Sequence, residues 1–233
     1  MNESIYIAED EDSIREAVQT FLESEGYNVV GFPTGDKLYE AFLKKPSDMV
    51  ILDIMMPGST GFQITKKIRE ISTVPIIILT ARDSEMDYAT GINMGSDDYF
   101  TKPFSVISLV MRVKAMFRRV QLDNQFSSSQ GEDEVAFADI IINKKNMKVY
   151  QGSRIIDFTP SEYNLLVYLA DNKDRAISRD ELLDNIWGYG KDIETRACDD
   201  TVRRLRKKLI NTRVKVETIW GYGFTLKEEK NEK

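Results

Sequence analysis

Short runs of apolar residues, each followed by polar residues, recur along the first half of the chain. The runs and the residues that follow them are Ile5–Ala8 with Glu9 and Asp10, Val50–Leu52 with Asp53, and Val74–Leu79 with Thr80. A further short strand is expected around Asp98–Thr101, just before Lys102. The run before Asp53 is broken by the turn residues of "MMPG". Continuous apolar runs bounded by turn residues predict strands that are buried on both faces of a parallel sheet.

Helical patterns of apolar spacing separate these strands, over residues 13–25, 34–44, 61–70, 84–94 and 106–119. Because strand and helix alternate five times, the pattern predicts an α/β fold, a doubly wound parallel five-stranded sheet with right-handed crossovers. In such sheets the chemistry lies outside the carboxyl ends of the strands. We therefore expect one shallow crevice formed by Glu9, Asp10, Asp53, Thr80 and Lys102.

The chemistry of these five residues is coherent. Three carboxylates held close together repel one another, and Mg²⁺, a hard cation that takes oxygen ligands, would relieve that repulsion. Asp53 could attack phosphorus as a carboxylate nucleophile, while Lys102 and Thr80 contact phosphoryl oxygens. Each residue also has a plainer interpretation, as a strand-end aspartate, a solvated loop lysine or a strand-end hydroxyl, but their joint occurrence at strand ends favours a site.

The chain changes character after Arg119, where "QLDNQFSSSQGEDE" has the composition of a linker. Four short strands are predicted beyond it, between Val135 and Phe158. Helices follow from Thr159 to about Ala170, from Ser178 to Trp187 and from Thr195 to Ile210, and the last two strands flank the glycine-rich "IWGYG". Thr159, Pro160 and Glu162 have the spacing of a helix start with a capping box.

The third of these helices concentrates the basic residues of the second half of the chain. An apolar stripe of Cys198, Val202, Leu205 and Leu209 predicts that the opposite face holds Arg196, Asp200, Arg203, Arg204 and Lys207. A charge run is usually only a solvated face. Here it lies on the last helix of three and precedes a glycine hairpin, which is the arrangement of a winged helix-turn-helix whose recognition helix enters the major groove of DNA, giving an α+β second domain.

Composition narrows the function classes. The chain has 233 residues, a net charge of −6, one cysteine and no histidine. The lack of histidine excludes a Ser-His-Asp triad, a histidine-ligated zinc and a phosphohistidine on this chain. No signal peptide and no apolar run of membrane length is present, so we expect a cytoplasmic protein that does not enter a membrane. Cys198 lies on the apolar stripe and is expected to be a small core residue, with a redox switch as the alternative.

Residues 1–121 resemble the receiver domain of two-component response regulators, on the Glu9-Asp10 pair, Asp53 with Met56-Pro57-Gly58, Thr80-Ala81, and Tyr99 with Lys102-Pro103-Phe104. The resemblance implies that Asp53 accepts a phosphoryl group from a partner histidine kinase. It implies Mg²⁺ bound by Glu9 or Asp10, by Asp53 and by the backbone carbonyl of Met55. It also implies that Thr80 and Tyr99 form a switch pair, that the Lys102-Pro103 peptide is cis, and that phosphorylation favours a homodimer.

Residues 133–229 resemble the effector domain of the OmpR/PhoB family, on "FTPSEYNLL", "RACDDTVRRLRKKL" and "TIWGYGFTL". The resemblance implies binding to operator DNA, and it implies that RNA polymerase contacts the loop 187–194. The DNA contacts that it implies, together with those expected from the helix itself, fall on Arg196, Asp200, Thr201, Arg203, Arg204, Lys207, Lys208 and Thr225. Among them we expect Arg204 to contact a base edge and Lys207 and Lys208 to contact phosphates.

Several residues depart from the family pattern. Thr225 and Trp220 replace basic residues of the wing, so the wing should contribute less charge to DNA binding. On the expected dimer face, Tyr88 and Ser108 stand where a lysine and a glutamate usually pair. The remaining candidate pairs between protomers are Asp97 with Arg112 and Asp98 with Arg119.

We therefore expect a receiver domain at 1–121, a linker at 122–132, a DNA-binding domain at 133–229 and a polar tail at 230–233. The expected function is a phosphorylation-regulated transcription factor that catalyses only its own phosphoryl transfer and dephosphorylation. Two other classes stay open. A phosphohydrolase or phosphomutase would share the acidic site but needs a general acid and a cap domain, and a DNA-binding protein with a degenerate receiver would not need the complete acidic set.

Overall fold

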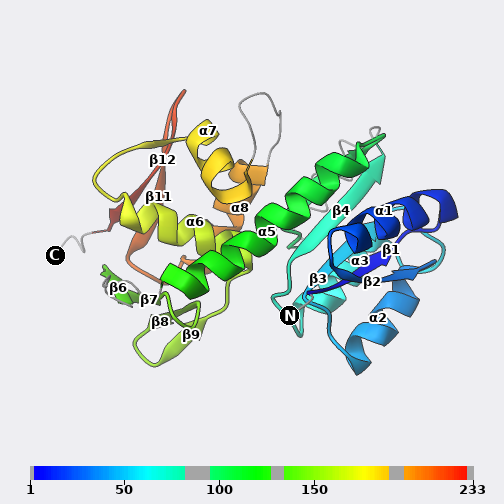
Figure 1. The fold of residues 1–233 in the computed structure, drawn as a ribbon. Helices are drawn as coiled ribbons and strands as arrows, with labels where there is room; N and C mark the ends of the chain where they lie inside the picture. The colour runs from blue at the N-terminus through cyan, green and yellow to red at the C-terminus, as the bar shows by residue number, and fades with distance from the viewer. Residues whose placement is uncertain (1–2, 82–94, 127–133, 189–196, 230–233) are drawn as a thin grey trace. The chain divides into compact units, whose positions relative to one another are not determined.

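The computed structural model describes residues 3–81, 95–126, 134–188 and 197–229 of the chain (Figure 1). It divides into two compact units, residues 1–114 and 115–233. The helix expected over residues 84–94 lies outside the described residues. Among the described helices, none combines the length and the apolar content that crossing a membrane would require.

The first unit is built on a five-stranded sheet in which every pair of neighbours runs parallel. Its strands are β1 (Ser4–Ala8), β2 (Asn28–Phe32), β3 (Met49–Asp53), β4 (Ile76–Ala81) and β5 (Asp98–Lys102), in the order β2-β1-β3-β4-β5. The predicted doubly wound sheet is thus confirmed. Because the chain passes from β1 to one side and later returns on the other, β1 and β3 form the switch point where such sheets bind ligands.

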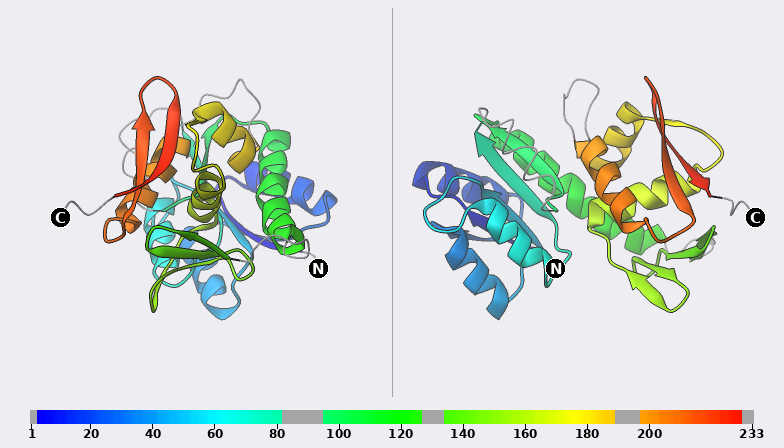
Figure 2. Two further views of the ribbon diagram at one scale, coloured as in Figure 1. Left: turned by 90° about the vertical axis from the view of Figure 1, so that its left-hand side faces the viewer. Right: turned by 180° about the vertical axis from the view of Figure 1, so that it is seen from behind.

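Helices cover both faces of the sheet (Figures 1 and 2). Helices α2 (Gly35–Lys44) and α3 (Gly61–Arg69) share a buried apolar cluster with Val50, Leu52, Ile76 and Ile78. These strand residues lie on one face because side chains alternate along a strand. Helices α1 (Asp12–Ser24) and α5 (Val106–Phe126) lie on the other face. Helix α5 does not end near 119 but covers the first part of the predicted linker.

The edge strand β2 was not recognised from the sequence. Its apolar residues Val29, Val30 and Phe32 include Gly31 between them, and only Val29 is fully buried. The partial burial is that of an edge strand, with one side open to solvent. A side chain at Gly31 would come within 2.8 Å of Gln19 Oε1, so the glycine lets α1 approach the sheet closely.

The second unit begins with an antiparallel sheet of β6 (Glu134–Phe137), β7 (Ile140–Asn143), β8 (Lys148–Gln151) and β9 (Arg154–Ile156). Three helical segments follow, namely α6 (Pro160–Asp171), α7 (Arg179–Leu182) continued by the π-helical turn η1 (Leu183–Trp187), and α8 (Ala197–Lys208). A second sheet joins β10 (Ile177–Ser178), β12 (Gly223–Glu228) and β11 (Val214–Ile219) in that order. The predicted order of elements, including the final hairpin, is confirmed.

One apolar core unites the helices and both sheets of this unit. Leu165 and Leu169 of α6, Trp187 of η1 and Leu205 of α8 are fully or almost fully buried in it. Helix α6 starts as the sequence predicts, since the backbone N–H of Thr159 donates a hydrogen bond of 3.0 Å to Glu162 Oε2. The β11–β12 hairpin extends from this core, as the two views of Figure 2 show.

The start of α3 leaves no room behind Asp53. A Cβ atom at Gly61 would lie 2.1 Å from the backbone carbonyl oxygen of Asp53, and Gly61 N–H already donates to Ile54 O at 3.1 Å. We predict that Gly61→Ala lowers the free energy of unfolding of the first unit by about 3 kcal/mol, because backbone atoms cannot move aside as a flexible side chain can. Hydrogen exchange of peptides from residues 3–81 measures this loss.

Gly26→Ala is the matched control in the same unit. Gly26 has φ +91° and open space around its Cβ position, so its substitution adds conformational strain without a collision and should cost about 1 to 2 kcal/mol. Equal losses in the two variants would mean that the contact with Asp53 is not what demands glycine at position 61.

Candidate functional site

Three carboxylates gather at the carboxyl ends of β1 and β3. Glu9 and Asp10 directly follow β1, and Asp53 ends β3. One oxygen from each lies within 4.8 Å of the others. Glu9 and Asp53 are buried and Asp10 is exposed, so the cluster is open to solvent on one side only. The structure therefore brings together the acidic residues that the sequence places at separate strand ends.

Lys102 at the end of β5 completes the cluster. Its Nζ lies 2.7 Å from Glu9 Oε2 and 3.2 Å from Asp53 Oδ2. The Lys102-Pro103 peptide bond is cis, as the resemblance implies. Because one lysine faces two buried carboxylates and an exposed third, the cluster holds more negative than positive charge.

Burial and neighbouring charges both shift the pKa values of this cluster. Burial raises the pKa of Glu9 and of Asp53 above the usual carboxyl range, and Lys102 lowers both in part. Burial also lowers the pKa of Lys102, but its hydrogen bond to Glu9 and the charges of Asp53 and Glu9 raise it overall. A further cation at the open side would stabilise the ionised forms of these carboxylates. An all-oxygen donor set of this kind fits Mg²⁺.

The residues next to the cluster occupy defined positions. Met55 lies in the turn after β3 with an exposed side chain, whereas Met56 is buried. Thr80 is buried on β4, and the sheet register pairs Ile78 of β4 with Tyr99 of β5. Since Thr80 is two residues from Ile78, Thr80 and Tyr99 lie on the same face of the sheet. Tyr99 is half-buried against the apolar cluster of that face.

The charged face of α8 differs from the prediction. Arg203 and Lys207 are exposed, as is Arg206, which the predicted site omitted. Thr201 and Arg204 are buried, so the expected base contact of Arg204 is not supported by its position. The hydrophobic stripe alone gave the wrong direction for Arg204, because its guanidinium is drawn inward by an acid on another helix.

That acid is Glu162 in the first turn of α6, which is only 1% exposed. Arg204 Nε lies 3.1 Å from Glu162 Oε1, and Lys208 Nζ lies 2.5 Å from Glu162 Oε2. Arg204 also donates to Thr201 Oγ1 at 3.0 Å. A buried carboxylate thus binds two cations spaced one helical turn apart, and this fixes the rotation of α8 about its axis. Lys208, predicted as a phosphate contact, is half-buried in this arrangement.

The other predicted DNA contacts differ in their exposure to solvent. Thr225 is buried, and its hydroxyl donates to Arg175 O at 3.2 Å, so it does not lie on the exposed surface of the hairpin. Asp200 is half-buried on α8. Arg196 and residues 189–194 of the proposed polymerase loop lie outside the described residues. The aromatic hairpin tip, by contrast, is exposed, with Trp220 at 93%.

The candidate dimer contacts are occupied within the chain. Asp97 pairs with Arg69 at 2.7 Å, and Asp98 pairs with Arg112 at 3.3 Å. Both aspartates are buried, and burial raises the pKa of Asp98 to about 6 although Arg112 opposes it. The expected pairing of Asp97 with Arg112 between protomers stays a prediction. Ser108 is exposed, while Tyr88 and the side chain of Arg119 lie outside the described part of the structure.

Cys198 is buried on α8, 1% exposed. Burial raises the pKa of its thiol to about 12, and the neighbouring Asp199 acts in the same direction. The thiolate that redox chemistry needs is therefore scarce at neutral pH, which favours the core-residue interpretation.

Comparisons with known proteins cover both units. Residues 5–114 match the family described as "Response regulator receiver domain", and residues 152–226 match "Transcriptional regulatory protein, C terminal". The chain is 39% identical over 227 residues to "Uncharacterized transcriptional regulatory protein YclJ" of Bacillus subtilis (strain 168), covering 97% of this chain and 99% of that protein. It is 35% identical over 236 residues to "Regulatory protein VanR" of Enterococcus faecium, covering 98% and 100%.

A solved structure, "RitR mutant - C128S", is also similar. It has a TM-score of 0.76 and 25% sequence identity, and the match covers 97% of this chain and 100% of that one. The similarity to these proteins therefore extends over nearly the full length, not over one unit alone.

The Glu162 contacts make a specific prediction about stability. Glu162→Gln should lower the free energy of unfolding of the second unit by about 3 kcal/mol, because Arg204 then remains buried without its counter-charge. Urea unfolding followed by tryptophan fluorescence measures this unit, since both Trp187 and Trp220 belong to it and only Trp187 is buried.

Asp171→Asn provides the control from the same helix. Asp171 pairs with Lys144 at 2.8 Å, but both side chains are more than a third exposed to solvent. Its removal should cost less than about 1 kcal/mol. If the two variants lose the same stability, Glu162 does not hold α8 in the way described.

Proposed function

This chain belongs to the OmpR/PhoB family of response regulators, phosphorylation-regulated transcription factors that join a receiver domain to a DNA-binding domain, and we propose that Asp53 is its phosphoacceptor. The proposal rests on one observation above all, the contact of Lys102 with both buried carboxylates at the carboxyl ends of β1 and β3. This arrangement holds a nucleophile, a cation and an open acidic side within a few ångströms of one another.

The proposed physiological donor is a phosphohistidine on a partner histidine kinase, because this chain has no histidine that could carry the group itself. A bond forms from an Asp53 carboxylate oxygen to phosphorus while the bond from phosphorus to the kinase's imidazole nitrogen breaks. The electron pair stays on the imidazole, which takes a proton from solvent. Lys102 neutralises charge on a phosphoryl oxygen, and Thr80 donates a hydrogen bond to another. Gly61 keeps the Asp53 backbone in position by allowing α3 to begin directly behind it.

Mg²⁺ belongs to this proposal because the donor set fits it. Glu9, Asp10 and Asp53, with the carbonyl of Met55, would hold the ion, which supplies positive charge next to the phosphoryl oxygens. The proximity of the three carboxylates, with the exposed Asp10 on the solvent side, supports this assignment.

Phosphorylation is proposed to act through Thr80 and Tyr99. Phosphate on Asp53 adds roughly −1.5 to −2 charges and strong acceptors. Thr80 would turn toward it, and Tyr99, on the same face of the sheet, would fill the space behind the hydroxyl. The β5–α5 surface would then favour a homodimer. The intrachain pairs of Asp97, Asp98 and Arg112 would help to shape that surface. Arg119 is the proposed residue for contact between protomers.

The DNA-binding face is proposed on α8. Arg203 and Lys207 are exposed there and would contact bases or phosphates, with Arg196 and Asp200 at the start of the helix. Lys208 would contribute less because Glu162 already binds its ammonium. The loop 187–194 is the proposed contact for RNA polymerase, and the cytoplasm, where kinase output and DNA meet, is the proposed location.

A phosphatase or mutase acting on small phosphate esters is the competing function for the acidic site. It would need a general acid beside Asp53, and Lys102, which contacts Asp53, is kept charged by the two carboxylates. We therefore propose that the chain catalyses only transfer to and loss from its own Asp53. Turnover of small phosphate esters by the purified protein would favour the enzyme instead.

Phosphorylation tests the acceptor directly. With Mg²⁺ and a small acyl-phosphate donor, wild-type protein should incorporate one phosphoryl group, and Asp53→Asn should incorporate none, because the amide is not a nucleophile toward phosphorus. Intact-mass spectrometry at neutral pH follows the added group. Chelation of Mg²⁺ should prevent labelling of the wild type.

Asp48→Asn is the control for the acceptor test. Asp48 is an exposed aspartate just before β3, where it accepts hydrogen bonds from Ser4, and it should leave labelling unchanged. Undiminished incorporation in Asp53→Asn would assign the phosphoryl group to another residue.

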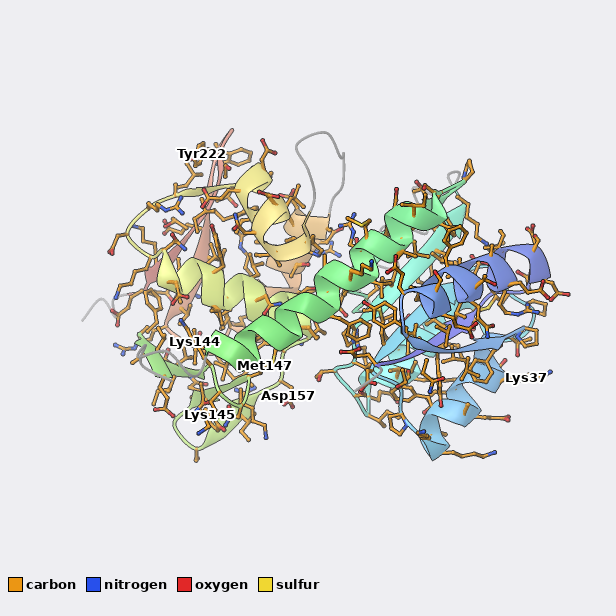
Figure 3. All side chains as sticks on the ribbon, in the orientation of Figure 1. Lys37, Lys144, Lys145, Met147, Asp157 and Tyr222 are labelled. Carbon is orange, nitrogen blue, oxygen red and sulfur yellow. The ribbon has the colours of Figure 1, made fainter. Side chains whose placement is uncertain are left out.

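Salt dependence tests the face of α8. Lys207→Ala should weaken binding to all DNA sequences alike and lower the slope of log affinity against log salt by about one, as the loss of one phosphate contact does. Lys145→Ala is the matched control, since Figure 3 shows Lys145 in the β7–β8 turn, well away from α8 within the same unit. An unchanged slope in Lys207→Ala would remove Lys207 from the DNA-binding face.

A further inference from the structure

Arg15, the one basic residue of α1, reaches back to the backbone of the acidic cluster. Its Nη1 donates a hydrogen bond of 2.7 Å to the backbone carbonyl of Glu9, and its Nη2 pairs with Asp12 in the first turn of the same helix. The Arg15 side chain is only 15% exposed. Two separate acceptors therefore fix the guanidinium, and one of them belongs to a residue of the cluster.

The edge strand β2 makes room for this arginine. A Cβ atom at Gly31 would lie 3.2 Å from both Cγ and Cδ of Arg15, so the glycine leaves a path for the arginine stem. The next residue of β2, Phe32, accepts a hydrogen bond of 3.1 Å from Glu9 N–H through its backbone carbonyl. The two peptide groups that flank Glu9 are thus both held, one by β2 and the other by Arg15.

The hydrogen bond to the Glu9 carbonyl also bears on Asp10. The carbonyl of Glu9 and the Cα atom of Asp10 belong to the same planar peptide group, so a contact that fixes the carbonyl also fixes the start of Asp10. The Asp10 carboxylate is exposed, and within the described part of the chain it accepts no hydrogen bond. Its direction is therefore set by the backbone that carries it.

We propose that Arg15 is a positioning residue for the divalent cation, and that it directs the Asp10 carboxylate toward Glu9 and Asp53 by fixing the Glu9-Asp10 peptide. The inference rests on the proposed function, because it takes Mg²⁺ to bind at these three carboxylates. Its own support is the hydrogen bond of Arg15 to the peptide group that joins two of them. Groups that orient a metal ligand without touching the metal contribute strongly to metal affinity.

The charge of Arg15 alone would have the opposite effect. A positive charge beside a cation site repels the cation, so its removal would strengthen metal binding if charge were all that mattered. Loss of positioning, by contrast, weakens metal binding because one ligand is no longer directed at the ion. The sign of the change in affinity therefore distinguishes the two roles.

The first test measures metal binding by the full-length protein. The probe is Mn²⁺ alone, which shares the preference of Mg²⁺ for carboxylate and carbonyl ligands and whose free form is counted by electron paramagnetic resonance. Arg15→Ala should bind Mn²⁺ roughly tenfold more weakly than the wild type. Arg15→Lys, which keeps the charge and one donor, should recover part of this loss.

Lys44→Ala is the matched control. Lys44 is an exposed cation in the last turn of α2, and α2 ends just before β3 begins, at the edge of the sheet opposite the cluster. Its substitution removes one positive charge from the same unit without touching the acidic residues. It should bind Mn²⁺ like the wild type.

A double-mutant cycle tests whether Arg15 acts through Asp10. In Asp10→Asn the ligand that Arg15 directs is already lost, so adding Arg15→Ala should weaken Mn²⁺ binding little further. The same loss in both backgrounds would contradict the proposal, because Arg15 would then act on metal affinity by a route that does not include Asp10.

Phosphorylation by a small acyl-phosphate donor gives a second readout. Arg15→Ala should need roughly tenfold more Mg²⁺ for its half-maximal rate. At saturating Mg²⁺ its rate should equal that of the wild type, because the bound ion then holds Asp10 in place. A lower rate at every Mg²⁺ concentration would indicate general damage to the site and would contradict a positioning role.

The outcomes separate this inference from the proposed function. Absence of both Mn²⁺ binding and phosphoryl incorporation in the wild type would overturn both. Unchanged or tighter Mn²⁺ binding by Arg15→Ala, with normal labelling of the wild type, would overturn only the role of Arg15. If hydrogen exchange shows that Arg15→Ala does not fold, Gly31→Ala replaces it, since it keeps the arginine charge but displaces the stem. Wild-type Mn²⁺ affinity in Gly31→Ala would then overturn the proposal.

Discussion

The contact of Lys102 with Glu9 and Asp53 is the interaction on which the chemistry of the first unit depends. Lys102 Nζ is 2.7 Å from one carboxylate and 3.2 Å from the other, and both acids are buried. One positive charge does not balance two buried acids and the exposed Asp10 beside them, so the site is held in a state that favours additional positive charge. The backbone keeps this arrangement, since β1, β3 and β5 end at the same edge and Gly61 allows α3 to begin behind Asp53.

The second unit uses a buried acid in the opposite way. Glu162 is surrounded by Arg204 and Lys208 and also accepts from the N–H of Thr159, so its charge is satisfied without any ligand. The first cluster is left short of cations and can respond to one. The second is complete and determines the orientation of α8. The two units thus differ in how many cations face a buried carboxylate. Too few cations leave the Glu9 and Asp53 site responsive to a ligand, and two cations on Glu162 keep the surface of α8 in one shape.

The sequence was sufficient for the fold and for most of the acidic site. Runs such as Ile5–Ala8 are buried on both faces, so their apolar pattern is unbroken and their ends can be located. It was not sufficient for β2, an edge strand in which only Val29 is fully buried. It also failed for Arg204, because the spacing along α8 is known from the sequence but the position of Glu162 on α6 is not. A helical pattern gives the direction of a side chain, and a tertiary ion pair can reverse it.

The contacts that hold α8 and the hairpin also bear on how phosphorylation could change DNA binding. Arg204 and Lys208 hold α8 against α6, and Arg206 holds the β11–β12 hairpin against α8. Loss of the Glu162 contacts would leave the buried Glu162 and Arg204 without their counter-charges, which is costly. Remodelling of the DNA-binding surface is therefore a poor route for regulation. Binding of two copies of the chain side by side on DNA requires none of these contacts to break. It would combine the DNA affinities of two α8 surfaces that are already formed. This favours dimerisation of the receiver domains, as proposed, over an internal change in α8 as the output of phosphorylation.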